Sequence, residues 1–132
     1  MNKRASLFCL PSFLLSFLPN LTVADIPDGV WVRDGFELTV AEDTIQKPRF
    51  MANGPDGTLF VSVIAEGKIL ACKDKDGDGR YESVTPFIEG KDARTRLQGV
   101  QFHNGWLYFA QLNAISRAKD TNGDGMADTV EE

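Results

Sequence analysis

The chain has little of several residue types on which common active sites depend. Its 132 residues include one histidine and two cysteines. No segment has the C-x-x-C-H spacing of a haem attachment, the glycine pattern of a phosphate-binding loop or a recognisable Ser/His/Asp set. Lysine and arginine number 14 against 19 aspartate and glutamate residues, so the net charge is −5. Nucleic-acid binding is therefore not expected, because contacts with phosphate need clustered basic residues.

Residues 1–24 differ in composition from the rest of the chain. Two basic residues precede a short apolar run at residues 7–18, and the small residue Ala24 lies before the expected cleavage point. This is the layout of a secretory signal peptide. The run is short for a membrane span and Pro11 interrupts it. We therefore expect an exported protein, periplasmic or extracellular, with no membrane span after cleavage. Its one remaining cysteine, Cys72, excludes an intrachain disulfide.

The remainder of the chain contains an internal repeat. Residues 55–63 and 103–111 each join a glycine turn to an apolar, aromatic-rich run. Residues 73–82 and 119–128 are both acidic and rich in glycine, and their first aspartates are 46 residues apart. A period in the mid-forties with several short strands per unit is typical of propeller blades.

Short β-type segments fill both repeat units. The expected strands are residues 49–53, 58–64, 68–73 and 80–88 in the first unit, and residues 99–103, 106–111 and 114–119 in the second. The sequence thus predicts an all-β fold, an incomplete β-propeller of about two four-stranded antiparallel blades after the signal peptide. The expected order is an N-terminal extension with a candidate closing strand (25–48), a first blade (49–90) and a second, incomplete blade (91–132).

The acidic segment of the second unit has the spacing of a helix–loop–helix calcium loop. It reads D-x-[DN]-x-[DN]-G-x5-E from Asp120 to Glu131. Such a hand needs a helix on each side, and the first unit has only six residues between Gly67 and Asp74. We therefore predict that both loops join strands. A small EF-hand-like calcium-binding protein is the competing interpretation.

Both acidic loops offer the oxygen ligands that calcium prefers over softer metals. The predicted ligands are Asp74, Asp76, Asp78 and Glu82 in the first loop, and Asp120, Asn122, Asp124, Asp128 and Glu131 in the second. Because the loops occupy equivalent positions in the repeat, we predict that calcium staples each hairpin. The alternative is a solvated Asp/Gly turn, which is common between strands.

The one histidine, His103, is a weak candidate for a catalytic base. It lies in the segment FHNG, where the first unit has GPDG. This position favours the alternative interpretation, in which His103 is a turn residue in front of a strand.

These motifs resemble those of a known family. The segment GFELTVAEDTIQKPRFMANGPDGTLFVS (35–62) resembles the start of the sorbosone and glucose dehydrogenase-like β-propellers. It is more similar still to an exported membrane-bound-dehydrogenase-type domain of planctomycete-type bacteria. GVQFHNGWLYFA (99–110) and DTNGDGMAD (120–128) fit the same group. The resemblance extends over residues 35–132.

The resemblance implies a six-bladed propeller of secreted or periplasmic sugar dehydrogenases, some of which use pyrroloquinoline quinone (PQQ) and calcium. A small sugar or aldehyde would be oxidised, and its electrons would pass to a quinone at the propeller centre. The family's catalytic histidine lies in an early blade, and its only possible counterpart here is His103. These properties are expectations from the resemblance.

Two units do not close a propeller, which needs four to eight blades. We therefore expect an N-terminal fragment of a larger propeller, inactive alone, with the remaining blades as its partners. Its unpaired edges would leave it marginally folded or prone to aggregate. A non-catalytic envelope propeller that binds protein or glycan is the alternative function.

Overall fold

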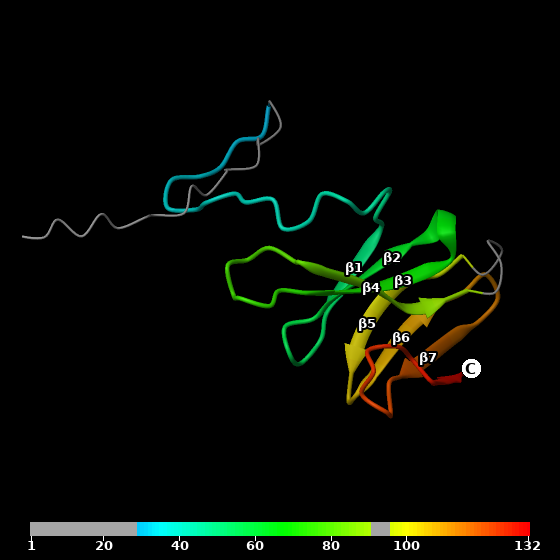
Figure 1. Cartoon of the computed structure of the whole chain (residues 1–132). Helices are drawn as coiled ribbons and strands as arrows, with labels where there is room; N and C mark the ends of the chain where they lie inside the picture. The colour runs from blue at the N-terminus through cyan, green and yellow to red at the C-terminus, as the bar shows by residue number, and fades with distance from the viewer. Residues whose placement is uncertain (1–28, 91–95) are drawn as a thin grey trace, which may run out of the picture.

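The structure, a computed structural model, describes residues 29–90 and 96–132 (Figure 1). Within these residues, eight strands form two four-stranded antiparallel sheets, and helix is limited to one 3-10 turn, Ile64–Glu66. The predicted all-β fold with two four-stranded antiparallel units is confirmed. The predicted signal peptide, residues 1–24, lies outside the described residues. So do residues 91–95, where the second predicted unit begins.

The first sheet contains its strands in chain order. They are β1 (Phe50–Asn53), β2 (Leu59–Val63), β3 (Lys68–Lys73) and β4 (Ser83–Glu89). The turn after β1 is closed by a hydrogen bond of 2.7 Å from Gly54 N to Thr58 O. Gly67 ends the 3-10 turn with a φ of 64°, a conformation that costs glycine little because it has no Cβ. β3 begins directly after it.

The second sheet repeats this order. Its strands are β5 (Gln98–His103), β6 (Trp106–Ala110), β7 (Ile115–Lys119) and β8 (Thr129–Glu131). Asn104 and Gly105 both have positive φ, 47° and 79°, as in the two-residue turns that suit the twist of a hairpin. The seven strands predicted from the sequence are confirmed, with differences of at most three residues at their ends.

The repeat makes residues of the two sheets equivalent. Leu59 and Leu107 each follow their turn glycine by two residues, and Phe60 and Tyr108 follow it by three. The strand registers agree, because Leu59 and Leu107 pair with the equivalent residues Cys72 and Ala118 of the next strand. Successive side chains of a strand point to opposite faces. Each sheet therefore has a leucine face and an opposite, aromatic face.

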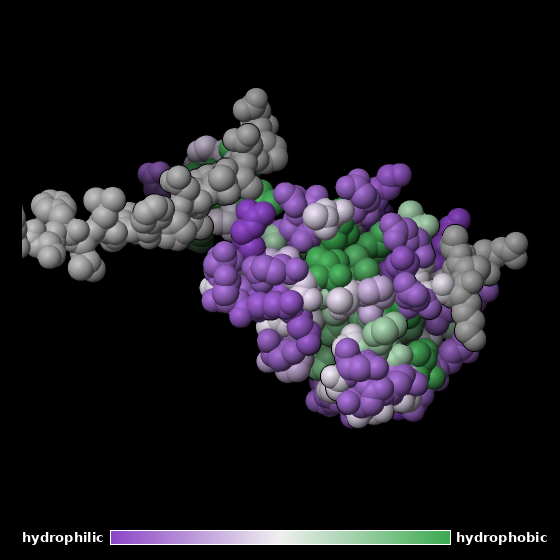
Figure 2. All heavy atoms as spheres, viewed as in Figure 1, coloured by the Kyte–Doolittle hydropathy of each residue, from purple (hydrophilic) through white to green (hydrophobic). Residues whose placement is uncertain are grey.

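The two sheets pack through unlike faces. Phe60 packs with Phe87 and Phe102, and the ring centroids are 4.8 and 5.8 Å apart. The buried cluster contains Phe60, Ile69, Ala71, Phe87, Leu97, Leu107, Phe109 and Ala118. The aromatic face of the first sheet thus covers the leucine face of the second. Figure 2 shows hydrophobic residues in the middle of the face in view, with hydrophilic residues around them.

A segment before β1 covers the leucine face of the first sheet. Val61 and Cys72 on this face are 2% and 0% exposed. A cavity of about 310 Å³ lies between this face and residues 39–48, and both line it. Tyr81 N donates a hydrogen bond of 2.9 Å to Ala41 O. Residues 29–48 contain no strand, so the closing strand stays a prediction. Within residues 29–90 and 96–132, no helix is long and apolar enough to cross a membrane.

Candidate metal centre

The first acidic loop joins β3 to β4, as predicted. Its two glycines, Gly77 and Gly79, have φ values of 80° and 90°. Residues with a Cβ rarely adopt this left-handed conformation. The glycines let the chain turn twice within a few residues. The side chains between β3 and β4 therefore point toward a common centre.

Asp74 holds the loop in this shape. Its carboxylate accepts hydrogen bonds from the amides of Gly77, at 2.6 Å, and Gly79, at 2.9 Å. These bonds lower the pKa of Asp74, because they favour the charged carboxylate. The bond from Gly79 contributes most to this shift. The folded loop therefore favours the ionised form of Asp74.

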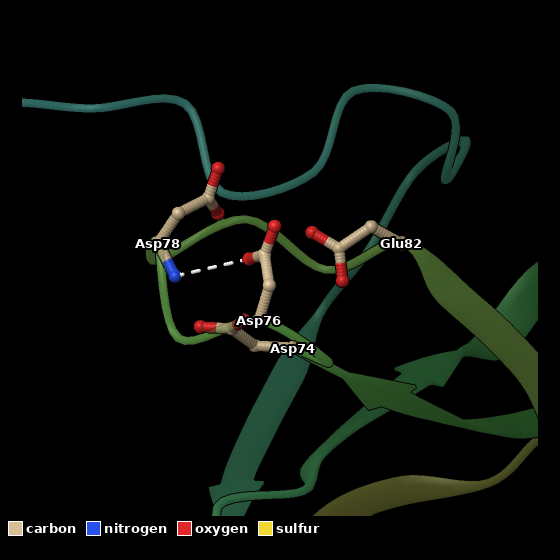
Figure 3. A group of neighbouring side chains, drawn as sticks. All are labelled: Asp74, Asp76, Asp78 and Glu82. Atoms are coloured by element: carbon tan, nitrogen blue, oxygen red, sulfur yellow. Dashed lines mark hydrogen bonds between the residues drawn. The ribbon is translucent and has the colours of Figure 1, made fainter.

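Four carboxylates converge on the centre of the loop. The ligand oxygens of Asp74, Asp76, Asp78 and Glu82 all lie within 4.8 Å of one another (Figure 3). Oxygens on opposite sides of one calcium ion are about 4.6–5.2 Å apart, since each lies 2.3–2.6 Å from the ion. The four groups therefore fit around one calcium ion. Asp74 is half-buried and the other three side chains are exposed.

Backbone amides also hold the other carboxylates of this loop. Asp76 accepts a hydrogen bond from Asp78 N at 3.2 Å, and Asp78 accepts one from Arg80 N at 2.8 Å. Glu82 reaches back across the hairpin to Lys75 N at 2.8 Å. Each carboxylate keeps a further oxygen or lone pair for a cation.

The second loop, between β7 and β8, is a copy of the first. Asp120 accepts hydrogen bonds from the amides of Gly123 and Gly125 at 2.6 and 2.8 Å. Those glycines have φ values of 82° and 91°. Asn122 and Asp124 accept the next two amide bonds in the same order as in the first loop. Both loops therefore join strands, and no helix flanks either one.

The second loop differs in how its last carboxylate is used. Asp128 accepts hydrogen bonds from Thr121 N and Oγ1, from Asn122 N and from Thr129 Oγ1. These bonds lower the pKa of Asp128, and the bond from the Thr121 side chain contributes most to this shift. Across residues 29–90 and 96–132, only the first loop brings three or more acidic, histidine or cysteine side chains to one point.

The structure places Glu131 outside the second loop. Its side chain lies on β8 and accepts hydrogen bonds from Arg117 Nη2 at 2.6 Å and Nε at 2.8 Å. Arg117 pairs directly with Glu131 across the sheet. The twelfth position of the sequence motif is thus occupied by a cross-strand ion pair.

Sequence reasoning missed the cluster around Arg117. Its guanidinium lies 4.3 Å from the ring centroid of Trp106 and donates to Tyr108 Oη at 3.4 Å. These residues lie on the partly exposed aromatic face of the second sheet. Their equivalents in the first sheet include Phe60 and Ala71, which are buried. An alignment of the two repeat units, combined with the alternation of side chains along a strand, would have placed Trp106, Tyr108 and Arg117 on the same face.

His103 ends β5 and is exposed. It pairs with Trp106 across the two-residue turn. This is the turn position that the sequence indicated.

Cys72 is fully buried. Burial, and to a lesser extent the negative charge of Glu42, raises the pKa of its thiol to about 11. A thiol with so high a pKa does not serve as a nucleophile at neutral pH.

A cavity of about 270 Å³ opens between the sheets beside the second acidic loop. Phe60, Phe87 and Phe102 line its apolar side, and Lys73 and Asp120 lie at its polar side. It is smaller than most pockets for organic ligands. The acidic loops are therefore the better candidate site.

A family model described as a domain of unknown function, DUF7133, matches residues 27–132. No curated protein and no solved structure matches the chain.

Proposed function

The chain belongs to the DUF7133 family, and we propose that it is a calcium-stapled section of an exported β-propeller of the quinoprotein dehydrogenase type. In this proposal, each four-stranded sheet is a blade, and the acidic loops bind calcium at one end of the blades. The oxidation of a small sugar or aldehyde belongs to the complete propeller. This section alone is inactive.

The packing of unlike faces is the observation that carries the propeller proposal. The aromatic face of the first sheet covers the leucine face of the second, and these faces are not equivalent in the repeat. Such head-to-tail contacts generate a ring when the rotation closes. The inner strands β1 and β5 also lie against each other, as expected of blades around a common axis. A symmetric pairing of like faces would instead end after two sheets.

The first loop carries the calcium proposal. Its ligand oxygens lie within 4.8 Å of one another, and all of them come from carboxylates, which suit a hard cation. Calcium would offset the repulsion among the four carboxylates. The second loop offers two aspartates and Asn122 on the same backbone, so its affinity is expected to be lower.

The described residues do not by themselves fit PQQ. Its carboxylates need basic partners, and the inner strands β1 and β5 contain no lysine or arginine. The only titratable side chain on them is His103, which is exposed. The proposal therefore assigns cofactor binding to other parts of a complete propeller. The resemblance to sugar dehydrogenases supports the activity, with His103 as the one residue that this section would contribute.

The composition of these inner strands also favours a second candidate function. Inner strands without basic residues suit a non-catalytic module that binds protein or glycan at the cell envelope. The partly exposed face with Trp106, Tyr108 and Arg117 is of the aromatic, arginine-containing kind that is enriched at interfaces. The enzyme assay described below separates the two functions.

Calcium titration tests the staple. We expect binding to the chain with a Kd on the order of 10⁻⁴–10⁻³ M, as in extracellular calcium modules. At calcium about tenfold above Kd, the free energy of unfolding should rise by about 1.4 kcal/mol. Isothermal titration calorimetry and thermal unfolding measure the two quantities. Magnesium at equal ionic strength is the control, because it tolerates only near-ideal octahedral geometry.

An equal rise in stability with magnesium or sodium would show ionic screening instead of a site. Absence of any calcium-dependent heat up to about 10⁻² M would reject the staple, because even weak extracellular modules bind below this concentration. The propeller proposal would survive that result, since it depends on the packing of the sheets.

A dye-linked assay tests the enzyme proposal. The longest product of the gene is incubated with PQQ, calcium and either glucose or an aldehyde, and the 132-residue chain is the matched control. We expect quinone-dependent dye reduction by the longer product only, with the rate lowered by His103→Ala. If PQQ gives no activity with any aldose or aldehyde, the binding-module function is favoured. Activity of the short chain would contradict the assignment of cofactor binding to other blades.

A further inference from the structure

Residues 39–48, which cover the leucine face of the first sheet, also cover the cysteine of that sheet. Cys72 is 0% exposed, and the cavity beneath the segment is lined by Cys72 on one side and by Ile45 on the other. Glu42 of the segment lies close enough for its charge to act on the Cys72 thiol. A reagent in solution therefore reaches Cys72 when the segment lifts or when the whole sheet unfolds.

The first acidic loop holds this segment in place. Among the described residues, one hydrogen bond joins residues 39–48 to the rest of the structure, and it runs from Tyr81 N to Ala41 O at 2.9 Å. Tyr81 lies in the loop between Asp78 and Glu82, two of the predicted calcium ligands. Figure 3 shows the segment running past the loop that carries these two carboxylates. The shape of the loop thus decides where the bond to the segment forms.

The second acidic loop makes the same contact. Ala127 N donates a hydrogen bond of 2.9 Å to Phe87 O of β4. Tyr81 and Ala127 are 46 residues apart, and so are the two acceptors, Ala41 and Phe87. Phe87 belongs to the cluster that covers the leucine face of the second sheet. In both repeat units, the loop amide therefore binds the element that covers the leucine face of its own sheet.

The first loop and the segment carry charges of the same sign. A cleft of about 410 Å³ between them is lined by the acidic residues Glu42, Asp43 and Glu82, and by one basic residue, Arg80. Glu82 also belongs to the four-carboxylate cluster of the loop. Without a cation, the loop repels the segment, and one arginine does not balance the excess of carboxylates. A divalent cation in the loop would offset this repulsion.

We propose that the acidic loops are also docking elements, and that calcium in the first loop closes residues 39–48 over the first sheet. The inference rests on the proposed calcium staple and gives it a second role. Calcium would fix the loop amide that binds Ala41, and it would offset the repulsion of Glu42 and Asp43. Because coupling between two sites is reciprocal, the docked segment raises the affinity for calcium by the same factor.

Alkylation of Cys72 in the full chain tests the closure. Iodoacetamide is added with calcium or with chelator, and mass spectrometry of the peptide that contains Cys72 separates it from Cys9. We expect saturating calcium to slow the alkylation of Cys72 by roughly tenfold, within the usual range of coupling between sites. The rates are compared at low urea, where they do not depend on urea, because such rates report local opening and not global unfolding. Magnesium at equal ionic strength is the control and should have little effect.

A double substitution away from the calcium ligands tests the reciprocal effect. Val40→Asn with Ile45→Asn places two polar groups in the apolar cavity beneath the segment and should lift the segment. We expect fast alkylation of Cys72 with and without calcium, and a calcium Kd raised by roughly tenfold. Phe36→Asn with Leu38→Asn is the matched control, because both side chains are exposed and line neither cavity. It should leave the alkylation rate and the Kd unchanged.

Four results would overturn the proposal. The first is the absence of calcium binding, which rejects the staple as well. The second is calcium binding that leaves the rate of Cys72 alkylation unchanged. The others are slow alkylation of Cys72 in the Val40→Asn, Ile45→Asn variant, and an unchanged calcium Kd in that variant when alkylation is fast. These last three reject the coupling and leave the staple standing. Near-UV circular dichroism confirms that each variant is folded, since the substituted residues lie outside the buried cluster.

Discussion

Positions 76 and 122 are equivalent in the two loops and differ by one charge. Asp76 and Asn122 each accept the amide bond of the residue two positions later, at 3.2 and 2.8 Å. The backbone around them is the same, with glycines at equivalent left-handed positions. The pair thus isolates the contribution of one carboxylate to calcium binding on a fixed scaffold.

Exchange of these residues gives a matched test. Asp76→Asn should weaken calcium binding at the first loop by about tenfold, because affinity in such loops follows the number of charged ligands. Asn122→Asp should strengthen binding at the second loop, and should lower stability in the absence of calcium through added repulsion. Isothermal titration calorimetry with and without chelator measures both effects. Equal calcium affinities in all three proteins would contradict a role for these side chains as ligands.

Whether a predicted ligand points into its loop depends on the other residues that its side chain contacts. The convergence of Asp74, Asp76, Asp78 and Glu82 follows the predicted spacing. Glu131 has the right spacing too, but strand pairing puts it opposite Arg117. Asp128 is bonded by two threonines. A motif records positions along the chain and contains no information about cross-strand neighbours.

At the level of strands and sheets, equivalent residues lie in different surroundings. Phe60 is 6% exposed between the two sheets. Its equivalent, Tyr108, lies on the partly exposed face of the second sheet and receives a hydrogen bond from Arg117. The repeat therefore supplies its own control for the contact between the sheets.

Phe60→Ala should lower the free energy of unfolding by about 3–5 kcal/mol, as expected for a buried phenylalanine. The same change at Tyr108 should cost about 1 kcal/mol, because a partly exposed side chain leaves no closed cavity. Urea denaturation followed by tryptophan fluorescence measures both. Similar losses at the two positions would indicate that the open face is covered in solution.

The strands themselves were predictable because their signals are local. Glycine turns, β-branched and aromatic runs and the two-residue Asn104–Gly105 turn each act within a few residues. The short β8 was harder, since TVE carries no alternating pattern of useful length. It is a strand because β7 offers it an edge.

At the scale of the whole molecule, acidic side chains dominate the charge. The carboxylates of Asp74 and Asp128 have lowered pKa values, because backbone amides, chiefly that of Gly79, bond the first, and Thr121 bonds the second. In the unfolded chain these bonds are lost and the pKa values return to about 4. The unfolded chain thus binds more protons than the folded chain between the two sets of values.

The contribution of these groups to stability is therefore fully present above about pH 4 and disappears as the pH falls through the lowered pKa values of the folded chain. In chelator, we expect the urea midpoint to fall progressively below about pH 4. Midpoints measured from pH 7 to pH 3 check this, with Asp74→Asn as the comparison. A midpoint that stays constant or rises on acidification would rule out the stabilising role of these hydrogen bonds.

The repeat, the first seven strands, the turns and the convergence of the first acidic loop follow from the sequence alone. All of these depend on side-chain types and backbone angles within one hairpin. Three features appear only in the tertiary structure. Unlike faces of the two sheets pack together, and residues 39–48 cover the first sheet. Glu131 forms an ion pair with Arg117 and does not point into the second loop. Those choices depend on which surfaces compete for burial, and such competition involves residues far apart in the chain.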